Sequence, residues 1–318
     1  MTITVLKPGL LTTIQDLGRH GHMAIGVGRA GPMDATSHRL ANALVGNDPS
    51  AASLEASLLG PRLRFDADAC IALTGAPFPA RLDGVALPMW RAHPVAAGQV
   101  LDMGAVRRGA RACLAVAGGF ATHAVLGSRA TDIHAHLGPF GGRPLATGDE
   151  LPIAAMRRRN AASWSLDPRP WFDPDPERPI RLIPGTHSDH LDAASRSALF
   201  NTGFRITADS NRTGFRLDGP RLALSAPLET VSEPVTFGTL QLPPGGQPIV
   251  LMAEHPTTGG YPRIGQVAAV DLPRLAQRPP GARVCFQSIG HDEAEARYLE
   301  YQRTLALLID RIARRLAG

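Results

Sequence analysis

Short apolar runs dominate the hydrophobic pattern of this chain. Residues 2–6 alternate between polar and apolar side chains, which predicts an opening strand that ends at Pro8-Gly9. Between residues 53 and 118, short apolar runs are separated by Gly, Pro and Asp, and a further strand pattern follows at residues 180–183. This spacing predicts a mainly β fold whose strands are mostly antiparallel and form a sheet or barrel.

A few segments have helical periodicity instead. Residues 34–45 predict a short helix with Asp34 as its N-cap and Gly46 at its stop, and residues 192–200 predict a second one. Residues 292–316 predict a C-terminal amphipathic helix. Its apolar residues recur at spacings of three and four: Ala294, Tyr298, Tyr301, Leu305, Leu308 and Ile312. We expect this helix to pack against the second domain, with docking of a partner as the alternative.

The length and one proline-rich stretch predict two domains. A chain of 318 residues is about twice a typical domain. Proline recurs too densely between residues 156 and 180 for a sheet or helix to continue. We therefore predict an N-terminal domain at 1–160, a linker at 161–179 and a C-terminal domain at 180–318. The shared order of a helix followed by Gly-Pro-Arg-Leu, at 60–63 and 219–222, favours a duplicated β-rich fold.

Composition supports the strand-rich prediction and excludes several kinds of chemistry. The chain holds 33 glycines and 28 prolines, which favour tight turns over long helices. The net charge is +5, but its arginines are scattered and 157–159 is the one dense run, so we expect no nucleic-acid partner. Lys7 is the only lysine and lies in the opening strand pattern. A phosphate-binding P-loop is therefore absent, and a biotin-attachment site on this chain is not expected.

Cysteine, histidine and hydropathy patterns predict a cytoplasmic protein without a metal. The three cysteines are far apart, so neither a disulfide framework nor a zinc knuckle is expected. Histidine pairs at 20/22, 134/136 and 187/190 have no acidic ligand or cysteine at a suitable spacing. No signal pattern and no apolar run of membrane-spanning length is present in the sequence.

Residues 12–21 form the first candidate functional loop. Gln15, Asp16, Arg19 and His20 place an amide, a carboxylate, a guanidinium and an imidazole close together. Arg19 can bind a carboxylate or phosphate, with backbone N–H groups helping at the neighbouring glycines. The alternative is a structural turn held by an Asp–Arg pair, and the residues alone leave both open.

Two further loops lie in the C-terminal half. Asn211 and Arg212, in Ser210–Arg216, suit amide or anion binding, whereas a plain turn between strands is the alternative. The second loop combines two hydroxyls, two glycines and an aromatic ring, which favours close backbone approach to a ligand, with the glycine amides as an anion nest. Its candidate residues are Thr257, Thr258, Gly259, Gly260 and Tyr261. In the first half, Glu55 is a carboxylate within an apolar strand pattern and needs a partner such as an arginine.

Taken in order, these segments resemble the motifs of the biotin-dependent carboxyltransferase family. The matching segments are Thr13–Gly21, Gly31–Asp34, Asn42–Asp48, Ala117–Gly119, Gly127–Asp132, Ser210–Gly214 and Thr257–Pro262. The family includes the KipA-like C subunit of 5-oxoprolinases, proteins similar to allophanate hydrolase subunit 2, and part of the urea carboxylase carboxyltransferase domain. One departure is residues 184–187, Pro-Gly-Thr-His, where relatives more often carry Pro-Gly-Pro.

The resemblance implies a fold, an activity and partners. It implies two cyclophilin-like β-barrel domains and a subunit of an ATP-dependent complex that opens 5-oxo-L-proline to L-glutamate. The partners would be a KipI-like B subunit together with the 5-oxoprolinase A subunit, and ATP with Mg would be shared with them. Biotin would enter only on another protein. We expect Asp16, Arg19, Asn211 and Arg212 to be catalytic, and Gln15, Glu55 and the 257–261 loop to bind substrate.

Two other functions remain open at this point. One is a carboxyltransferase component that moves a carboxyl group from carboxybiotin to a urea-like substrate. The other is a non-enzymatic partner of a KipI-like kinase inhibitor. The first predicts dependence on a separate biotin carrier, and the second requires only a partner-binding surface.

Overall fold

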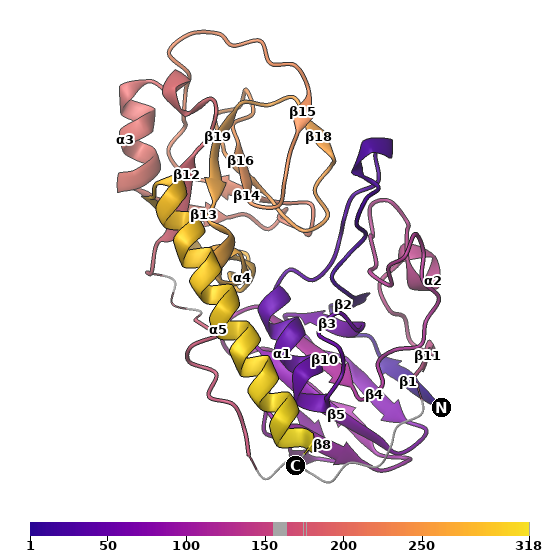
Figure 1. Cartoon of the computed structure of the whole chain (residues 1–318). Coiled ribbons are helices and arrows are strands. Elements are labelled where there is room, and N and C mark those ends of the chain that lie inside the picture. The colour runs from indigo at the N-terminus through magenta and orange to yellow at the C-terminus, as the bar shows by residue number, and fades with distance from the viewer. Residues whose placement is uncertain (155–163, 174, 176, 318) are drawn as a thin grey trace. The chain divides into compact units, whose positions relative to one another are not determined.

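The computed structural model describes residues 1–154, 164–173, 175 and 177–317 (Figure 1). The chain forms two compact units: unit 1 comprises residues 1–20, 30–174 and 306–318, and unit 2 comprises residues 21–29 and 175–305. The predicted boundaries differ from these units, because 21–29 belongs to unit 2 and 306–318 to unit 1. The predicted linker is divided, with 161–174 in unit 1 and 175–179 in unit 2. The basic run at 157–159 and part of the predicted linker lie outside the described residues.

Unit 1 contains two sheets. The six-stranded sheet has the order β11-β1-β4-β9-β6-β7, and the five-stranded sheet has the order β2-β3-β10-β5-β8. The strands are β1 (Thr2–Lys7), β2 (Leu11–Gln15), β3 (Ser53–Ser57), β4 (Arg62–Phe65), β5 (Ala69–Gly75), β6 (Arg81–Leu82), β7 (Val85–Ala86), β8 (Ala92–Val95), β9 (Val100–Asp102), β10 (Arg111–Val116) and β11 (Glu150–Pro152). Ile3, Leu54, Phe65, Ile71 and Leu114 belong to one buried core to which both sheets contribute. The predicted mainly β fold is confirmed.

Helix α1 (Ala35–Val45) packs against β5 and β10 in unit 1 (Figure 1). Its start follows from Asp34, whose carboxylate accepts a hydrogen bond from the Ser37 backbone N–H at 2.9 Å. Its end follows from Gly46, which has the left-handed conformation that glycine adopts most readily. Both predicted ends of this helix are therefore confirmed. The short α2 (Pro139–Gly142) also belongs to unit 1.

Part of the predicted linker packs onto unit 1. Trp164 and Leu166 contact a buried cluster that includes residues of α1, β5 and β10, and Phe172 packs against the main core of the unit. The Leu166 N–H donates to the Trp90 carbonyl at 2.8 Å, and the Arg315 guanidinium lies 5.1 Å from the Trp164 ring centroid. The proline density correctly indicated a break in regular structure, but residues 164–172 are not a simple spacer.

Unit 2 contains a closed barrel with the order β12-β19-β16-β17-β14-β13-β20. Its strands, with the small β15/β18 pair beside them, are β12 (Ile180–Pro184), β13 (Gly203–Ile206), β14 (Gly214–Asp218), β15 (Glu233–Pro234), β16 (Thr239–Gln241), β17 (Ile249–Leu251), β18 (Thr258–Gly259), β19 (Arg263–Val267) and β20 (Arg283–Ser288). The barrel closes through β12 and β20, which are parallel, whereas its other pairs are antiparallel.

Three α-helices begin in unit 2. They are α3 (Ala193–Asn201), α4 (Leu272–Ala276) and the long α5 (His291–Ala317). The predicted helices at 192–200 and 292–316 correspond to α3 and α5. Leu305 and Ile312 of the predicted apolar stripe are buried, but Tyr298 is 39% exposed. The short 3₁₀ turns are η1 (Met23–Ile25), η2 (Ser188–His190) and η3 (Ala269–Asp271).

The repeated Gly-Pro-Arg-Leu sequence does not mark equivalent elements. In unit 1 its Arg-Leu begins β4, whereas in unit 2 it follows β14 and lies outside the named strands. The order of helix and motif is therefore no guide to a duplication in this structure.

Candidate functional site

In unit 1, the carboxylate of Asp16 organises the loop that follows β2. It accepts hydrogen bonds from the Ser128 hydroxyl at 2.5 Å, the Arg129 backbone N–H at 2.5 Å and the Gly18 backbone N–H at 2.9 Å. Three donors on one carboxylate hold the loop in one conformation. Asp16 therefore connects two distant motifs of the sequence, 13–21 and 127–132.

The neighbours of Asp16 strengthen the same connection. The Arg19 guanidinium donates to the Ala130 carbonyl, and the Gln15 amide donates to the Thr131 carbonyl at 3.0 Å. The Thr131 N–H donates in turn to the carbonyl of Ile14 at 2.8 Å. Arg19 is only 1% exposed and Gln15 is fully buried. These contacts form a brace between two loops, which we call the loop brace (Gln15, Asp16, Arg19 and residues 128–131).

Glu55 lies in β3 and supports the start of α1. It is 2% exposed, and its carboxylate accepts hydrogen bonds from the backbone N–H groups of Met33 at 2.8 Å and Asp34 at 3.3 Å. Asp34 caps α1, so Glu55 fixes the turn from which the helix begins. The partner that the sequence required for this buried carboxylate includes backbone N–H groups, because the tight turn at 31–34 directs them toward β3.

His38 is fully buried on α1, and one of its ring nitrogens lies 2.8 Å from the Ser53 hydroxyl. Burial lowers the pKa of His38 to about 4, with the charge of Asp16 opposing this shift and that of Arg39 adding to it. His38 is therefore neutral near pH 7. A neutral imidazole in this position contributes packing and hydrogen bonding to unit 1.

In unit 2, Arg212 forms a buried ion pair. Its Nε lies 2.5 Å from Glu254 Oε1, and the two side chains are 4% and 2% exposed. The same two residues are also joined through their backbones, because the Glu254 N–H donates to the Arg212 carbonyl at 2.8 Å. A pair at this depth is costly to desolvate and stabilises the fold only while both partners are present. Arg212 therefore joins the segment before β14 to the segment after β17.

Asn211 is exposed and lies in a turn just before β14. Its side-chain oxygen accepts hydrogen bonds from the backbone N–H groups of Thr213 at 2.8 Å and Gly214 at 3.2 Å. This is the Asx-type turn that the sequence left open as the alternative for 210–216. The amide oxygen of Asn211 is consequently committed to its own backbone.

The predicted glycine nest at 259–260 is not present. Thr258 and Gly259 form β18, which pairs with Glu233 and Pro234 of β15, and neither glycine has a positive φ. A nest requires backbone alternating between right- and left-handed conformations, so an extended strand cannot form one. Gly259 has a packing reason instead, because a Cβ there would lie 2.4 Å from the Gln241 side-chain nitrogen. Gln241 is itself 4% exposed.

The last residues of this loop line a groove of 890 Å³ in unit 2, which we call the Tyr261 groove. Its walls come from residues 222–230, 242–244 and 260–262. Tyr261 is 46% exposed, so its phenol offers one hydroxyl donor and acceptor to a ligand. Of the predicted site residues, Gly260 and Tyr261 reach this groove, whereas Asn211, Arg212, Thr257, Thr258 and Gly259 are not among the residues that line it.

Further side chains hold the segments beside the groove. Arg263 forms an ion pair with Glu233, and the Thr230 hydroxyl donates to the Gly260 carbonyl. A ring nitrogen of His187 accepts from the Arg263 backbone N–H at 3.0 Å. Burial, aided by the Arg263 charge, lowers the pKa of His187, which favours this accepting role. The unusual 184–187 segment therefore supports β19 next to the groove.

Reasoning from the sequence missed several partners that complete these arrangements. Ser128 was part of a quoted motif but was not selected, and Glu254, Gln241 and Glu233 lie in segments without a distinctive local pattern. The Glu254 contact is recognisable only from the burial of both Glu254 and Arg212, and burial is known only once the fold is known. Among the described residues, no group of three or more His, Cys, Asp or Glu side chains is placed to hold a metal ion. Within that same part of the chain, no helix has the length and apolar character needed to cross a membrane.

Comparison with known proteins identifies the family. The family described as carboxyltransferase domain, subdomain A and B, matches residues 25–288. The 5-oxoprolinase C subunit of Escherichia coli (strain K12) is 38% identical over 293 residues, which cover 92% of this chain and 93% of that protein.

Two solved structures agree with this assignment. The Kluyveromyces lactis urea carboxylase matches with a TM-score of 0.88 and 27% identity, over 98% of this chain and 29% of that one. The protein TTHA0988 matches with a TM-score of 0.79 and 35% identity, over 90% of this chain and 55% of its own. The chain therefore spans about half of one of these proteins and less than a third of the other. From its motifs, its fold and these relatives, we conclude that the chain belongs to the carboxyltransferase domain family, subdomains A and B.

Proposed function

We propose that this chain is the C subunit of an ATP-dependent 5-oxoprolinase complex that converts 5-oxo-L-proline to L-glutamate. The observation that carries the proposal is the near end-to-end match to the Escherichia coli C subunit, which covers 92% of this chain and 93% of that protein. The relatives named for urea chemistry match only a part of much longer chains.

The Tyr261 groove is the proposed substrate surface. 5-Oxoproline carries a lactam and a carboxylate on a small apolar ring, which suits a concave surface with apolar walls and a few polar groups. Leu222 and Leu242 contribute apolar walls, and Tyr261 presents its hydroxyl. Opening the lactam places negative charge on its oxygen, and a fixed O–H donor stabilises that charge. The Arg263–Glu233 pair and the Thr230 hydroxyl position the loop on which Tyr261 lies.

The proposal includes partners and a compartment. The 5-oxoprolinase A subunit, together with a KipI-like B subunit, would complete the complex in the cytoplasm, and the site for ATP with Mg would be shared with them. Lys7 is exposed and belongs to the β1 ladder with Arg62 as its register partner. In this proposal, any biotin would act from another protein.

The likeness to the urea carboxylase structure supports a second candidate, because its TM-score is 0.88 over 98% of this chain. In that case the same groove would accept a urea-like amide, and the carboxyl group would arrive on a biotin carried by another protein. The two candidates differ in one dependence, since only the second requires biotin.

The test compares two exposed residues in the reconstituted complex. Tyr261→Phe removes one hydroxyl from the groove, and Val231→Ala trims a side chain that is 83% exposed and does not line it. We expect Tyr261→Phe to lower 5-oxoproline turnover by about tenfold to a hundredfold, because one donor to developing charge is lost. Val231→Ala should stay within about twofold, as surface substitutions usually do.

Two outcomes would redirect the proposal. Equal turnover in both variants and the unmodified chain would exclude the Tyr261 groove as the substrate surface. Loss of activity on adding avidin, with turnover of urea rather than 5-oxoproline, would favour the carboxyltransferase candidate.

A further inference from the structure

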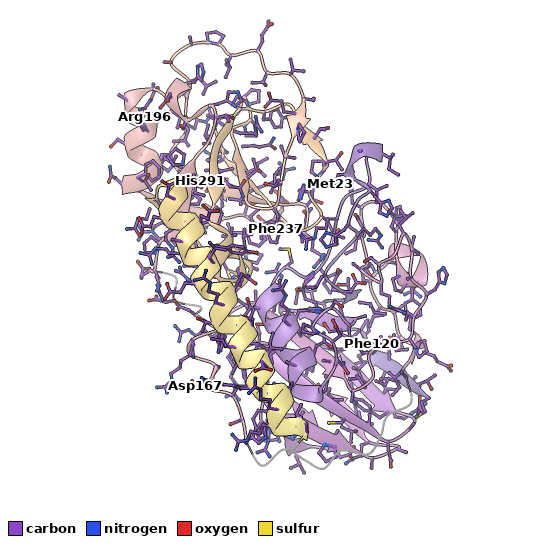
Figure 2. The ribbon with its side chains drawn as sticks, in the orientation of Figure 1. Met23, Phe120, Asp167, Arg196, Phe237 and His291 are labelled. Carbon is purple, nitrogen blue, oxygen red and sulfur yellow. The ribbon has the colours of Figure 1, made fainter. Side chains whose placement is uncertain are left out.

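A second concave site in unit 2 has a different character from the Tyr261 groove. It has a volume of 260 Å³ and lies where β12, β20, α4 and the first turns of α5 meet. Its lining includes four arginines, Arg178, Arg181, Arg274 and Arg297, together with Gln287 and Ser288. We call it the arginine pocket. His291, labelled in Figure 2, marks the end of α5 that adjoins it.

The inner wall of the pocket is built on a fully buried carboxylate. Arg181 and Arg274 both contact the same oxygen of Asp271, at 2.6 Å and 2.9 Å. Asp271 is 0% exposed, so this negative charge holds two guanidinium groups side by side. The Arg274 guanidinium also donates to the carbonyls of Arg178 and Pro179, which fixes its plane. The two arginines are therefore pre-positioned and share the counter-charge of Asp271.

The register of the parallel strands brings further polar groups to the same place. Arg181 of β12 is the register partner of Gln287 in β20, so their side chains point to the same face. Ser288 ends β20, and α5 begins three residues later. The N-terminal end of a long helix carries a partial positive charge, which adds to the potential of the arginines.

The outer wall of the pocket contains a second negative group, Glu293. Arg297 contacts Glu293 one helical turn earlier, with Nη2 at 2.8 Å from Oε1, and both side chains are about half exposed. Glu293 and Arg181 line the same pocket. The hydrogen bond with Asp271, with a smaller contribution from the Glu293 charge, raises the pKa of Arg181. Four arginines line the pocket, Glu293 is the one acid among its lining residues, and Asp271 lies behind Arg181 and Arg274.

We propose that the arginine pocket binds a small oxyanion of the phosphate class. Guanidinium groups held in fixed planes match the geometry of phosphate oxygens, and an anion complements the arginine side chains of the lining. At 260 Å³ the pocket is smaller than the sites that usually enclose drug-sized ligands, which favours a free ion over a whole nucleotide. This inference is independent of the substrate of the Tyr261 groove and concerns different residues.

The test is calorimetric titration of the full chain with inorganic phosphate. We expect saturable binding with a Kd of about 1 mM or tighter, at low salt and pH 7.5. Arg297→Gln should weaken binding by about tenfold, because a charged donor is lost. Glu293→Gln should strengthen it by several-fold, because the internal competitor for Arg297 is removed. A purely structural role for this ion pair predicts no such opposite pair of effects.

A matched control lies on the same helix. Arg314 forms an equivalent i,i+4 pair with Asp310 at 2.8 Å and does not line the pocket. Arg314→Gln therefore removes the same charge from α5 and should leave phosphate binding unchanged. Equal weakening by Arg297→Gln and Arg314→Gln would show general charge attraction and overturn the proposal. If binding shows no saturation at a phosphate concentration about twenty times the expected Kd, the proposal is overturned as well.

Competition distinguishes the two sources of phosphate chemistry. ATP should fail to displace phosphate if the pocket accepts only the free ion. Displacement by ATP with an affinity that also falls in Arg297→Gln would assign the pocket to a nucleotide phosphoryl group, which overturns the free-ion form of the proposal. Thermal melts of each variant without phosphate check that the fold is retained.

Discussion

The loop brace of unit 1 and the Tyr261 groove of unit 2 both come from segments rich in glycine and polar residues. In the brace, Asp16, Arg19 and Gln15 are turned toward residues 128–131, and Arg19 and Gln15 are almost completely buried. In the groove, Tyr261 keeps nearly half of its surface exposed. The same kind of sequence therefore has two physical uses. The polar groups of the loop brace hold loops in place, whereas those of the Tyr261 groove are exposed to solvent.

This contrast changes the roles expected of individual residues. A side chain buried away from solvent, like Arg19 or Gln15, has little access to a ligand, and its replacement mainly lowers the free energy of unfolding. An exposed phenol on a concave surface is accessible to a ligand, and its replacement should change activity more than the free energy of unfolding. Stability and activity measurements on matched variants therefore separate the two regions.

The largest expected effect concerns Arg212. Replacement by Ala leaves the Glu254 carboxylate buried without this guanidinium, which should lower the free energy of unfolding by about 3–5 kcal/mol. Chemical denaturation of the isolated chain measures it. Replacing both residues with Leu should cost less than Arg212→Ala alone, because the buried charge is then removed as well. If the loss of unfolding free energy in the double variant equalled the sum of the losses in the two single variants, the two residues would not be coupled.

The second effect is pH dependence from His38. Its pKa in the folded chain is about 4, below the ordinary value of 6.5, so the unfolded chain takes up the proton first as pH falls. The stabilisation from neutral burial is complete above pH 6.5 and is lost progressively toward pH 4, by about 3 kcal/mol in all. His38→Gln should lack this component. A stability difference between the two proteins that stays constant from pH 7 to pH 4 would contradict the assignment.

A smaller effect is expected for Asp16→Asn. The variant keeps the shape but weakens the hydrogen bonds to Ser128 and Arg129, with an expected loss of about 2 kcal/mol. Asp48 is a matched control, because it accepts from the Ser50 hydroxyl at 2.5 Å and the Ser50 N–H at 2.8 Å on an exposed turn. Asp48→Asn should cost under about 1 kcal/mol. Equal losses in the two variants would show that burial is not what makes the brace strong.

The smallest effect on stability is expected for Tyr261→Phe. The side chain is 46% exposed, so the free energy of unfolding should change by less than about 0.5 kcal/mol. The same variant is the one for which we expect the large loss of turnover. A strong destabilisation by Tyr261→Phe would show that Tyr261 holds the fold together, as the brace residues do, and would contradict a role in ligand binding.

Local signals predicted the parts of the fold that depend on neighbouring residues. Asp34 and Gly46 marked both ends of α1, and helical periodicity located α5. Pairings across the chain were out of reach, because a carboxylate does not identify its partner from sequence spacing. Ser128 is 112 residues from Asp16, and Glu254 is 42 residues from Arg212. For the same reason the sequence selected Asp16, Arg19 and Arg212 as polar and clustered but did not distinguish buried braces from ligand contacts.

The central proposal is that this chain acts as the obligatory C subunit of a 5-oxoprolinase complex. The most direct measurement is ATP-dependent conversion of 5-oxoproline to glutamate by the chain together with the proposed A and B subunits, with each component omitted in turn. We predict turnover by the complete set and none when this chain is left out. Undiminished turnover without it would contradict the claim. A complete set without turnover would contradict it too, and would favour carboxyl transfer or a role as partner of a KipI-like inhibitor.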